Sequence, residues 1–346
     1  MKSETKPIHG LTRNELVELC AGLNQPSYRA AQIWRWLHVN RVGDWQQMTN
    51  IPAAIRTQLA GSFSFFSMQA EGSKKSADTS LKVLARLHDG ETVEFVVIPA
   101  PRRTTVCVSS QVGCKFDCAF CASGRSGFTR SLDAGEMVEE LLLAEKEYGE
   151  KPTHVVFMGI GEPFDNYDNV LKAVRIINDQ EGLAIGARRI TISTCGIIPG
   201  IERLAGEGLQ VELSVSLHAP NDELRTRLMP VNRRYGVGPL LDACRQYTQQ
   251  TGRLITFEYA MIRGVNDSRS HAEELAGKLK SFQCRVNLIP LSEVEEYGGK
   301  ASTPEVVNMF IKVLGEAGVN ATLRNSRGSE LKAACGQLRA SHARKA

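Results

Sequence analysis

The chain of 346 residues is long enough for about two domains, and its 42 % hydrophobic and 23 % charged residues are ordinary for a globular protein. The 42 basic and 38 acidic residues give a net charge of +4, which permits an anionic partner without requiring one. No run of 18 or more apolar residues is present, and the first residues lack the apolar core of a signal peptide. We therefore expect a cytoplasmic protein with no membrane partner.

The first 65 residues carry three stretches with the periodicity of helices, at 12–22, 28–38 and 52–60. Thr12 and Glu15 have the spacing of a capping box at the start of the first stretch. We expect residues 1–65 to form a small helical accessory domain. Its arginines, at 29, 35 and 41, either face RNA or belong to a solvated surface, and the sequence leaves both interpretations open.

Residues 66–100 contain two alternating runs on either side of Asp89-Gly90, a dipeptide that favours a β-hairpin. From residue 101 onward, strand-like runs alternate with amphipathic stretches, which predicts right-handed βαβ units and an α/β fold with a parallel sheet. About six repeats fit a partial (β/α)6 barrel over 101–338, followed by a basic tail at 339–346. The predicted strands are 104–110, 154–159, 189–194, 211–217, 254–261, 285–290 and 321–325, and predicted helices include 134–149, 271–282 and 304–318.

Nine cysteines are an odd number and many for a reducing compartment, so ligand or catalytic use is more plausible for some of them than a disulfide framework. Cys20, Cys244 and Cys284 lie in apolar patterns and are expected to be small buried side chains.

Cys114, Cys118 and Cys121 have the spacing Cys-x3-Cys-x2-Cys and follow the first strand of the predicted barrel. Such barrels gather their chemistry at the carboxyl ends of the strands. Thiolates suit zinc or iron–sulfur clusters, but a structural zinc site would need a second cysteine pair, which the sequence lacks. Three cysteines holding a 4Fe–4S cluster would leave one iron open to another ligand.

Polar residues also follow the other predicted strands, where they would outline a nucleoside-sized site. Glu162, after Gly161, can accept hydrogen bonds from an ammonium group, or it can cap a glycine-rich turn. The remaining residues are each open to the plainer interpretation of polar loop entry: Ser193, Ser216, Leu217, His218 and Asn287.

The cysteine spacing resembles the signature of radical S-adenosylmethionine (SAM) enzymes. The segments SSQVGC, MGIGEP, STCGIIP, SLHAPND, GVND, NLIP and AACGQL, in this order, resemble the RlmN/Cfr family of radical SAM RNA adenine methyltransferases. The resemblance implies a partial barrel of radical SAM type, with SAM binding the open iron and yielding a 5′-deoxyadenosyl radical. It also implies that the Gly161-Glu162 pair binds the SAM amino group, and that two SAM molecules are used per turnover.

The resemblance further implies roles for three residues that spacing alone would not single out. Cys335 would take a methyl group from one SAM, and the radical from a second SAM would activate that methyl group for addition to adenine. Cys107 would resolve the resulting protein–RNA adduct by forming a disulfide with Cys335. Glu94 would lie near the adenine as a base or hydrogen-bond acceptor, although it also fits an exposed strand carboxylate.

Within the family, the paired alanines before Cys335 look closer to RlmN, which implies methylation of adenine C2 in 23S rRNA and beside the tRNA anticodon. The alternatives are C8 methylation, as in Cfr, and a non-catalytic iron–sulfur RNA-binding protein. We also expect a one-electron donor such as flavodoxin and a monomeric state. Two features depart from the family pattern: the loop at 291–302 and the positive charge of Lys332. The basic pairs at 102–103, 188–189 and 233–234 are candidate phosphate contacts.

Overall fold

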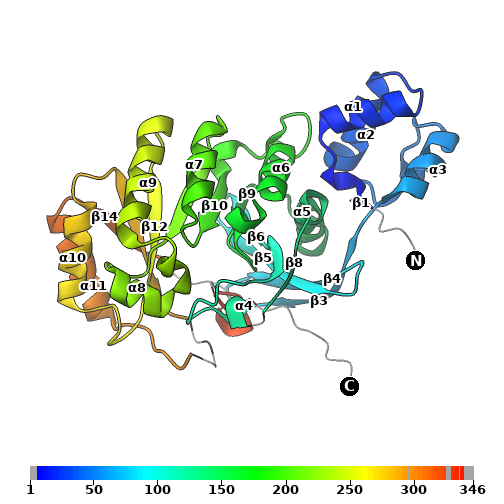
Figure 1. The fold of residues 1–346 in the computed structure, drawn as a ribbon. Coiled ribbons are helices and arrows are strands. Elements are labelled where there is room, and N and C mark those ends of the chain that lie inside the picture. Colours follow the sequence, from blue (N-terminus) through cyan, green and yellow to red (C-terminus); the bar gives the residue numbers. More distant parts are fainter. Residues whose placement is uncertain are drawn as a thin grey trace.

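The computed structural model describes residues 6–125, 127–292, 294, 297–324, 329–334 and 336–338. A ten-stranded mixed sheet, in the order β14-β13-β12-β11-β10-β9-β6-β5-β4-β3, organises most of this chain (Figure 1). Its strands are β3 (Met68–Lys75), β4 (Leu81–Leu87), β5 (Thr92–Ala100), β6 (Arg103–Val108), β9 (His154–Phe157), β10 (Ile190–Thr194), β11 (Glu212–Ser216), β12 (Ile255–Met261), β13 (Cys284–Pro290) and β14 (Asn320–Leu323).

Seven neighbouring strands, from β6 through β14, run parallel. The sequence predicted all seven, and each described strand end lies within two residues of the predicted one. Six β/α units, from β6 to β13, are followed by β14 at one end of the strand order, so the sheet forms the predicted partial barrel. The helices of this region are α4 (Ala122–Arg125), α5 (Ala134–Tyr148), α6 (Tyr167–Asn178), α7 (Ile198–Gly206), α8 (Asp222–Leu228), α9 (Val237–Thr251), α10 (Arg269–Leu279) and α11 (Pro304–Glu316).

Three antiparallel strands extend the sheet beyond β6. The hairpin expected around Asp89-Gly90 consists of β4 and β5, and β5 also pairs with β6. β3 is a further strand that the sequence did not predict, because it has one buried residue and lacks clear alternation. A short antiparallel pair, β7 (Gln111–Gly113) and β8 (Phe128–Ser131), flanks the cysteine segment.

The N-terminal residues form a separate group of helices in Figure 1. The predicted capping box is present, since Glu15 N–H donates to Thr12 Oγ1 and Thr12 N–H donates to the Glu15 carboxylate. These helices contact α5 through His9 and Glu139, both fully buried. The elements are β1 (Lys6–Pro7), η1 (Ile8–Gly10), α1 (Arg13–Gly22), α2 (Tyr28–Trp34), the π-helical η2 (Arg35–Asn40), η3 (Trp45–Gln47), α3 (Ala53–Ser62) and β2 (Phe63–Ser64).

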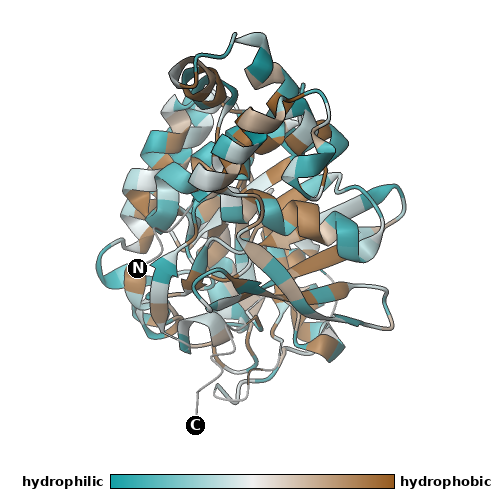
Figure 2. Ribbon diagram, turned by 90° about the vertical axis from the view of Figure 1, so that its right-hand side faces the viewer, coloured by the Kyte–Doolittle hydropathy of each residue, from teal (hydrophilic) through white to brown (hydrophobic). Residues whose placement is uncertain are grey.

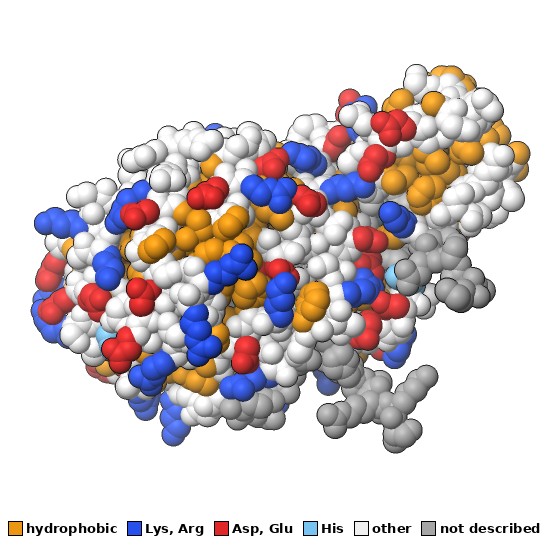
Figure 3. Space-filling view, in the orientation of Figure 1, with side chains coloured by type: hydrophobic (Ala, Val, Ile, Leu, Met, Phe, Trp, Pro, Cys, Tyr) orange, Lys and Arg blue, Asp and Glu red, His pale blue; other side chains and the backbone are white. Residues whose placement is uncertain are grey.

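Hydrophobic residues concentrate on the strands and on the helix sides that face them (Figure 2). Cys20 and Cys244 are fully buried in this core and Cys284 is nearly so, as predicted. Basic and acidic side chains are interspersed on the face shown in Figure 3, consistent with the small net charge. None of the helices in the described part of the chain has both the length and the apolar character that crossing a membrane requires.

Candidate active site

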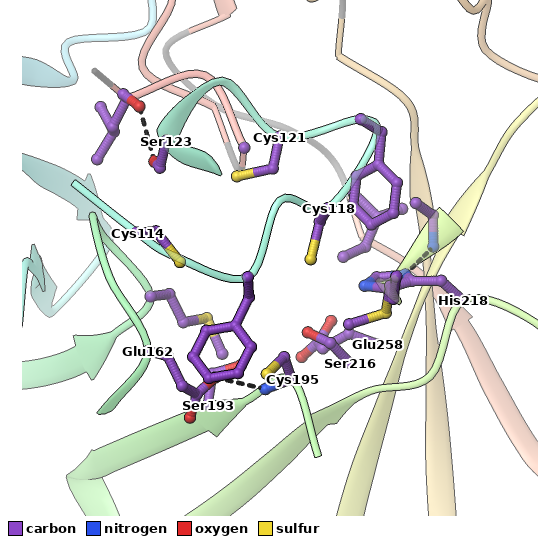
Figure 4. A pocket seen from close by; sticks show the side chains of 18 of the residues that line it. Cys114, Cys118, Cys121, Ser123, Glu162, Ser193, Cys195, Ser216, His218 and Glu258 are labelled. Carbon is purple, nitrogen blue, oxygen red and sulfur yellow. Dashed lines mark hydrogen bonds between the residues drawn. The ribbon is translucent and has the colours of Figure 1, made fainter. Parts of the chain in front are cut away.

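A pocket lies at the carboxyl ends of the parallel strands, where barrels of this kind gather their chemistry. Strand-end residues from β9 to β13 line it, together with the cysteine loop after β7 (Figure 4). The polar and thiol side chains that face one another there are Cys114, Cys118, Cys121, Glu162, Ser193, Cys195, Ser216, His218 and Glu258.

The backbone around the cysteine loop is held by hydrogen bonds to distant segments. Cys114 N–H donates to Gly127 O at 2.9 Å, and Ala119 N–H donates to Leu228 O at 2.9 Å. Gly113 has φ +75°, and a Cβ added to it would lie 1.8 Å from Gly127 O, so no other residue fits there. This local structure carries the three cysteines into one pocket, as their spacing predicted.

The three thiols are ligands of the kind that iron–sulfur clusters take. Burial, followed by the neighbouring thiols and carboxylates, raises the pKa of Cys118 well above its ordinary value, and burial raises the pKa of Cys114 to about 12. Such thiols ionise only when a metal replaces the proton. Within the described ranges, no group of three His, Cys, Asp or Glu residues is arranged to hold one ion.

Glu162 caps the glycine-rich turn, which is one of the two roles that its sequence left open. Its Oε1 accepts from Phe164 N–H at 2.9 Å, which caps η4 (Pro163–Asn166), and its Oε2 accepts from Cys195 N–H at 2.6 Å. The side chain nevertheless lines the pocket, and burial raises its pKa. Gly161 has φ +106°, and an added Cβ would lie 2.6 Å from Gln111 Cβ. The backbone therefore requires glycine before this carboxylate.

His218 is held as a neutral hydrogen-bond donor. Its Nδ1 accepts from Ala260 N–H at 2.8 Å, which places the ring proton on Nε2. Burial, with a smaller contribution from Arg225, lowers the pKa of His218 to about 3. Leu217, one residue earlier, is fully buried, and its side chain does not line the pocket. Its backbone N–H donates to Glu258 O at 3.0 Å.

Asn287 lies one layer away from the pocket. It is not a lining residue; its Nδ2 donates to Glu258 Oε1 at 3.2 Å, and its Oδ1 accepts from Thr322 Oγ1 at 3.0 Å. Glu258 itself lines the pocket and was missed by the sequence interpretation. The sequence feature that could have revealed Glu258 is an acidic residue inside the apolar run ITFEYAM. Burial raises the pKa of this carboxyl group.

Arg225 and Cys195 were also missed. Cys195 places a fourth thiol in the pocket, and its pKa is raised well above the ordinary value by burial and then by Glu162. Arg225 is fully buried under the strand ends and donates to the carbonyls of Cys195, Ser216 and Leu217. No sequence pattern reveals these partners, because they are backbone atoms of distant loops.

Cys107 and Glu94 lie on one face of the sheet beside the pocket. In the register, Lys82, Val96 and Cys107 form a row across β4, β5 and β6, and Glu94 shares the face of Val96 because it lies two residues away. Glu94 is 8 % exposed and pairs with Lys82, so it is not an exposed strand carboxylate.

The C-terminal segment covers this face. Cys335 lies outside the described residues, but its described neighbours Ala333 and Leu338 pack with Cys107 in one apolar cluster. Gly336 O accepts from Ala122 N–H at 2.7 Å, and Leu338 O accepts from Ser123 Oγ at 2.8 Å. The chain on both sides of Cys335 therefore lies between Cys107 and α4, which follows the cysteine loop (Figure 1).

The three basic pairs are exposed but lie at different ends of the sheet. Arg102-Arg103 and Arg188-Arg189 are at the amino ends of β6 and β10, away from the pocket. Arg233 ends η6 (Pro230–Arg233) and Arg234 follows it, after β11, on the pocket side. The basic tail lies outside the described residues.

Comparison with known proteins gives consistent matches. Residues 108–276 match the radical SAM superfamily model, and residues 7–64 match the ribosomal RNA large subunit methyltransferase N-terminal domain model. Proteins described as "Probable dual-specificity RNA methyltransferase RlmN" are 45 % identical in Geobacillus kaustophilus (97 % of this chain, 94 % of that protein) and in Thermoanaerobacter sp. strain X514 (96 % and 97 %). The crystal structure of a radical SAM methyltransferase from Sphaerobacter thermophilus matches with a TM-score of 0.93 and 46 % identity, over 96 % of this chain and 99 % of that one.

Proposed function

The chain belongs to the RlmN family of radical SAM methyltransferases, and from this premise we propose that it methylates C2 of adenine in 23S rRNA and in tRNA beside the anticodon. The observation that carries the proposal is the placement of Cys107 beside the chain that flanks Cys335, next to a three-cysteine pocket. The relatives' description as dual-specificity RNA methyltransferases supports two RNA targets.

We infer that Cys114, Cys118 and Cys121 hold a 4Fe–4S cluster and leave one iron open to SAM. When bound, the cluster supplies the electron that cleaves SAM. Glu162 would accept from the SAM amino group, while Ser193, Ser216 and His218 Nε2–H offer polar contacts to its other groups. Leu217 would contribute through its backbone, and Asn287 through the carboxylate of Glu258 that it orients.

In the proposed reaction Cys335 carries the methyl group, which it takes from one SAM before a second SAM binds. An sp² carbon of adenine is a poor nucleophile, so a methyl carrier activated by a radical is needed. Cys107 then attacks the sulfur of Cys335 in the resulting protein–RNA adduct. The bond from that sulfur to the methylene carbon breaks, the carbon takes the electron pair and a proton, and methylated RNA leaves as the Cys107–Cys335 disulfide forms. Glu94 would accept a hydrogen bond from the adenine or take its proton.

The target adenine must leave its base stack to reach this pocket. Arg233-Arg234, on the pocket side, is the basic pair best placed to contact phosphates. We propose residues 1–65 as an accessory RNA-binding domain, 66–100 as a hairpin linker, 101–338 as the catalytic core and 339–346 as a basic tail. A monomer reduced by a donor such as flavodoxin would suffice for turnover.

Mass spectrometry of nucleosides from rRNA and tRNA, with and without the gene, tests the proposal. We expect 2-methyladenosine to disappear from both RNAs when the gene is absent. Finding 8-methyladenosine instead would assign the C8 reaction of Cfr. Absence of 5′-deoxyadenosine when reconstituted protein meets SAM and a reductant would indicate a non-catalytic RNA-binding protein.

A further inference from the structure

Lys82 on β4 has three acceptors around its ammonium group. Its Nζ lies 2.7 Å from Glu94 Oε1, and it donates to Leu331 O at 3.4 Å and to Lys332 O at 3.3 Å. A lysine has three N–H donors and no acceptor, so these partners match its full donor capacity. Its side chain is 17 % exposed and that of Glu94 is 10 % exposed, so the pair is largely shielded from solvent.

The two carbonyls belong to the segment that leads to Cys335. Leu331 ends η7 (Ser329–Leu331), and Lys332 follows with φ +50°, a left-handed conformation that is uncommon for a lysine. The Lys332 side chain is exposed while its carbonyl turns toward Lys82. The charge that departs from the family pattern therefore lies on an exposed side chain, and the backbone carbonyl makes the contact with Lys82.

A second contact, made from the turn that precedes β4, supports this attachment. Ala77 N–H, in the turn between β3 and β4, donates to Glu330 Oε2 at 3.3 Å. Beyond it, Ala333 packs against the apolar row that contains Val96 and Cys107. Lys82 lies in this same cross-strand row, opposite Val96.

We propose that Lys82 is a positioning residue. Its ammonium ties the Glu94 carboxylate to the backbone at Leu331 and Lys332, and so fixes the segment before Cys335 relative to both Glu94 and Cys107. This inference rests on the proposed function, because it concerns the residues to which methyl transfer is assigned. Lys82 does not line the cofactor pocket, so its role is separate from cluster and SAM binding.

The test uses the full-length protein with its cluster, carrying Lys82→Met, which keeps the side-chain stem but removes the charge and donors. Lys82→Arg is the conservative variant. Lys74→Met is the matched control, because Lys74 is the exposed cross-strand neighbour of Lys82 on β3. Lys82→Gln, which retains two donors, replaces the Met variant if that variant does not fold.

The first measurement is the rate at which Cys107 and Cys335 form a disulfide when diamide accepts their two hydrogen atoms, followed by peptide mapping. The second is hydrogen–deuterium exchange of the peptide covering 329–338. Because a hydrogen bond to a charged group is lost, we expect Lys82→Met to slow disulfide formation and to speed exchange, each about tenfold. Lys82→Arg should recover most of the wild-type disulfide rate and most of the wild-type protection from exchange, and Lys74→Met should match wild type. Iron content and 5′-deoxyadenosine formation should stay within about twofold of wild type in these variants.

Wild-type disulfide and exchange rates in folded Lys82→Met would overturn the proposal, as would equal effects in Lys74→Met. Neither measurement requires RNA. A wild-type protein that makes no methylated adenosine would therefore refute the proposed function without deciding the role of Lys82.

Discussion

Arg225 on α8 donates from Nη2 to the carbonyl of Cys195 at 2.7 Å, and so joins a fully buried guanidinium to the end of β10. The same side chain donates to Ser216 O at 3.1 Å and to Leu217 O at 3.2 Å. Its Nη1 donates to Asn232 Oδ1 and to Tyr235 O. Two neighbouring strand ends of the pocket are thus fixed by one side chain.

Replacing Arg225 with Met should destabilise the protein strongly. The substitution leaves several buried carbonyls without donors, which costs about 3–5 kcal/mol in the free energy of unfolding. Urea denaturation measures the change. Arg227→Met, at an exposed position on the same helix, is the control and should stay within about 0.5 kcal/mol of wild type. Equal stability of the two variants would show that Arg225 does not hold the strand ends.

Alanine at Cys114, Cys118 or Cys121 should abolish cluster binding, because each thiolate is assigned to a different iron. Iron and acid-labile sulfide per protein, measured after anaerobic reconstitution, give the readout. Cys284→Ala is the control, since this thiol lies at the start of β13, away from the pocket. Full iron loading of any of the three pocket variants would remove that cysteine from the ligand set.

Alanine at Cys335 should abolish methylation, because no thiol remains to carry the methyl group. Alanine at Cys107 should instead let a covalent protein–RNA adduct accumulate, because the thiol that resolves it is absent. Denaturing gels with labelled RNA and intact-protein mass spectrometry distinguish the two results. Full turnover by the Cys335 variant would refute the proposed mechanism.

His218 should make folding stability depend on pH. The unfolded imidazole gains a proton below about pH 6.5, whereas burial lowers the folded pKa to about 3. Between these values the unfolded state binds more protons, so stability is lost as the pH falls through this window. His218→Asn keeps an acceptor for Ala260 N–H but cannot take up the proton. Between pH 7 and pH 5, wild type should lose about 2 kcal/mol more than this variant in urea denaturation; parallel losses would contradict the assignment.

Alanine at Gly161 should lower both stability and SAM affinity. Its φ of +106° and the 2.6 Å approach to Gln111 Cβ leave no room for a methyl group without moving the backbone that presents Glu162. Thermal unfolding and equilibrium dialysis with SAM report the two effects. Gly206→Ala, at the end of α7 with open space around it, is the control and should leave SAM affinity unchanged. Normal SAM binding by the Gly161 variant would separate this turn from the SAM site.

Local patterns in the sequence predicted much of the fold and part of the site. The Thr12–Glu15 capping box and the seven parallel strands follow from spacing and alternation within short segments, which tertiary contacts did not override. The cysteine spacing likewise placed three thiols together, because one loop carries them all. β3 escaped prediction because its pairing with β4, and not its own pattern, makes it a strand.

Tertiary structure decided what no single segment contains. Asn287 was placed at a strand end, but only the register shows that it orients Glu258 and does not line the pocket. Arg225 and Lys82 look like surface residues in sequence, yet they bind backbone carbonyls of segments that folding brings beside them. The sequence by itself determined the chemical groups and their order along the chain. Which groups meet was decided by sheet register and burial, because these depend on contacts between residues far apart in the chain.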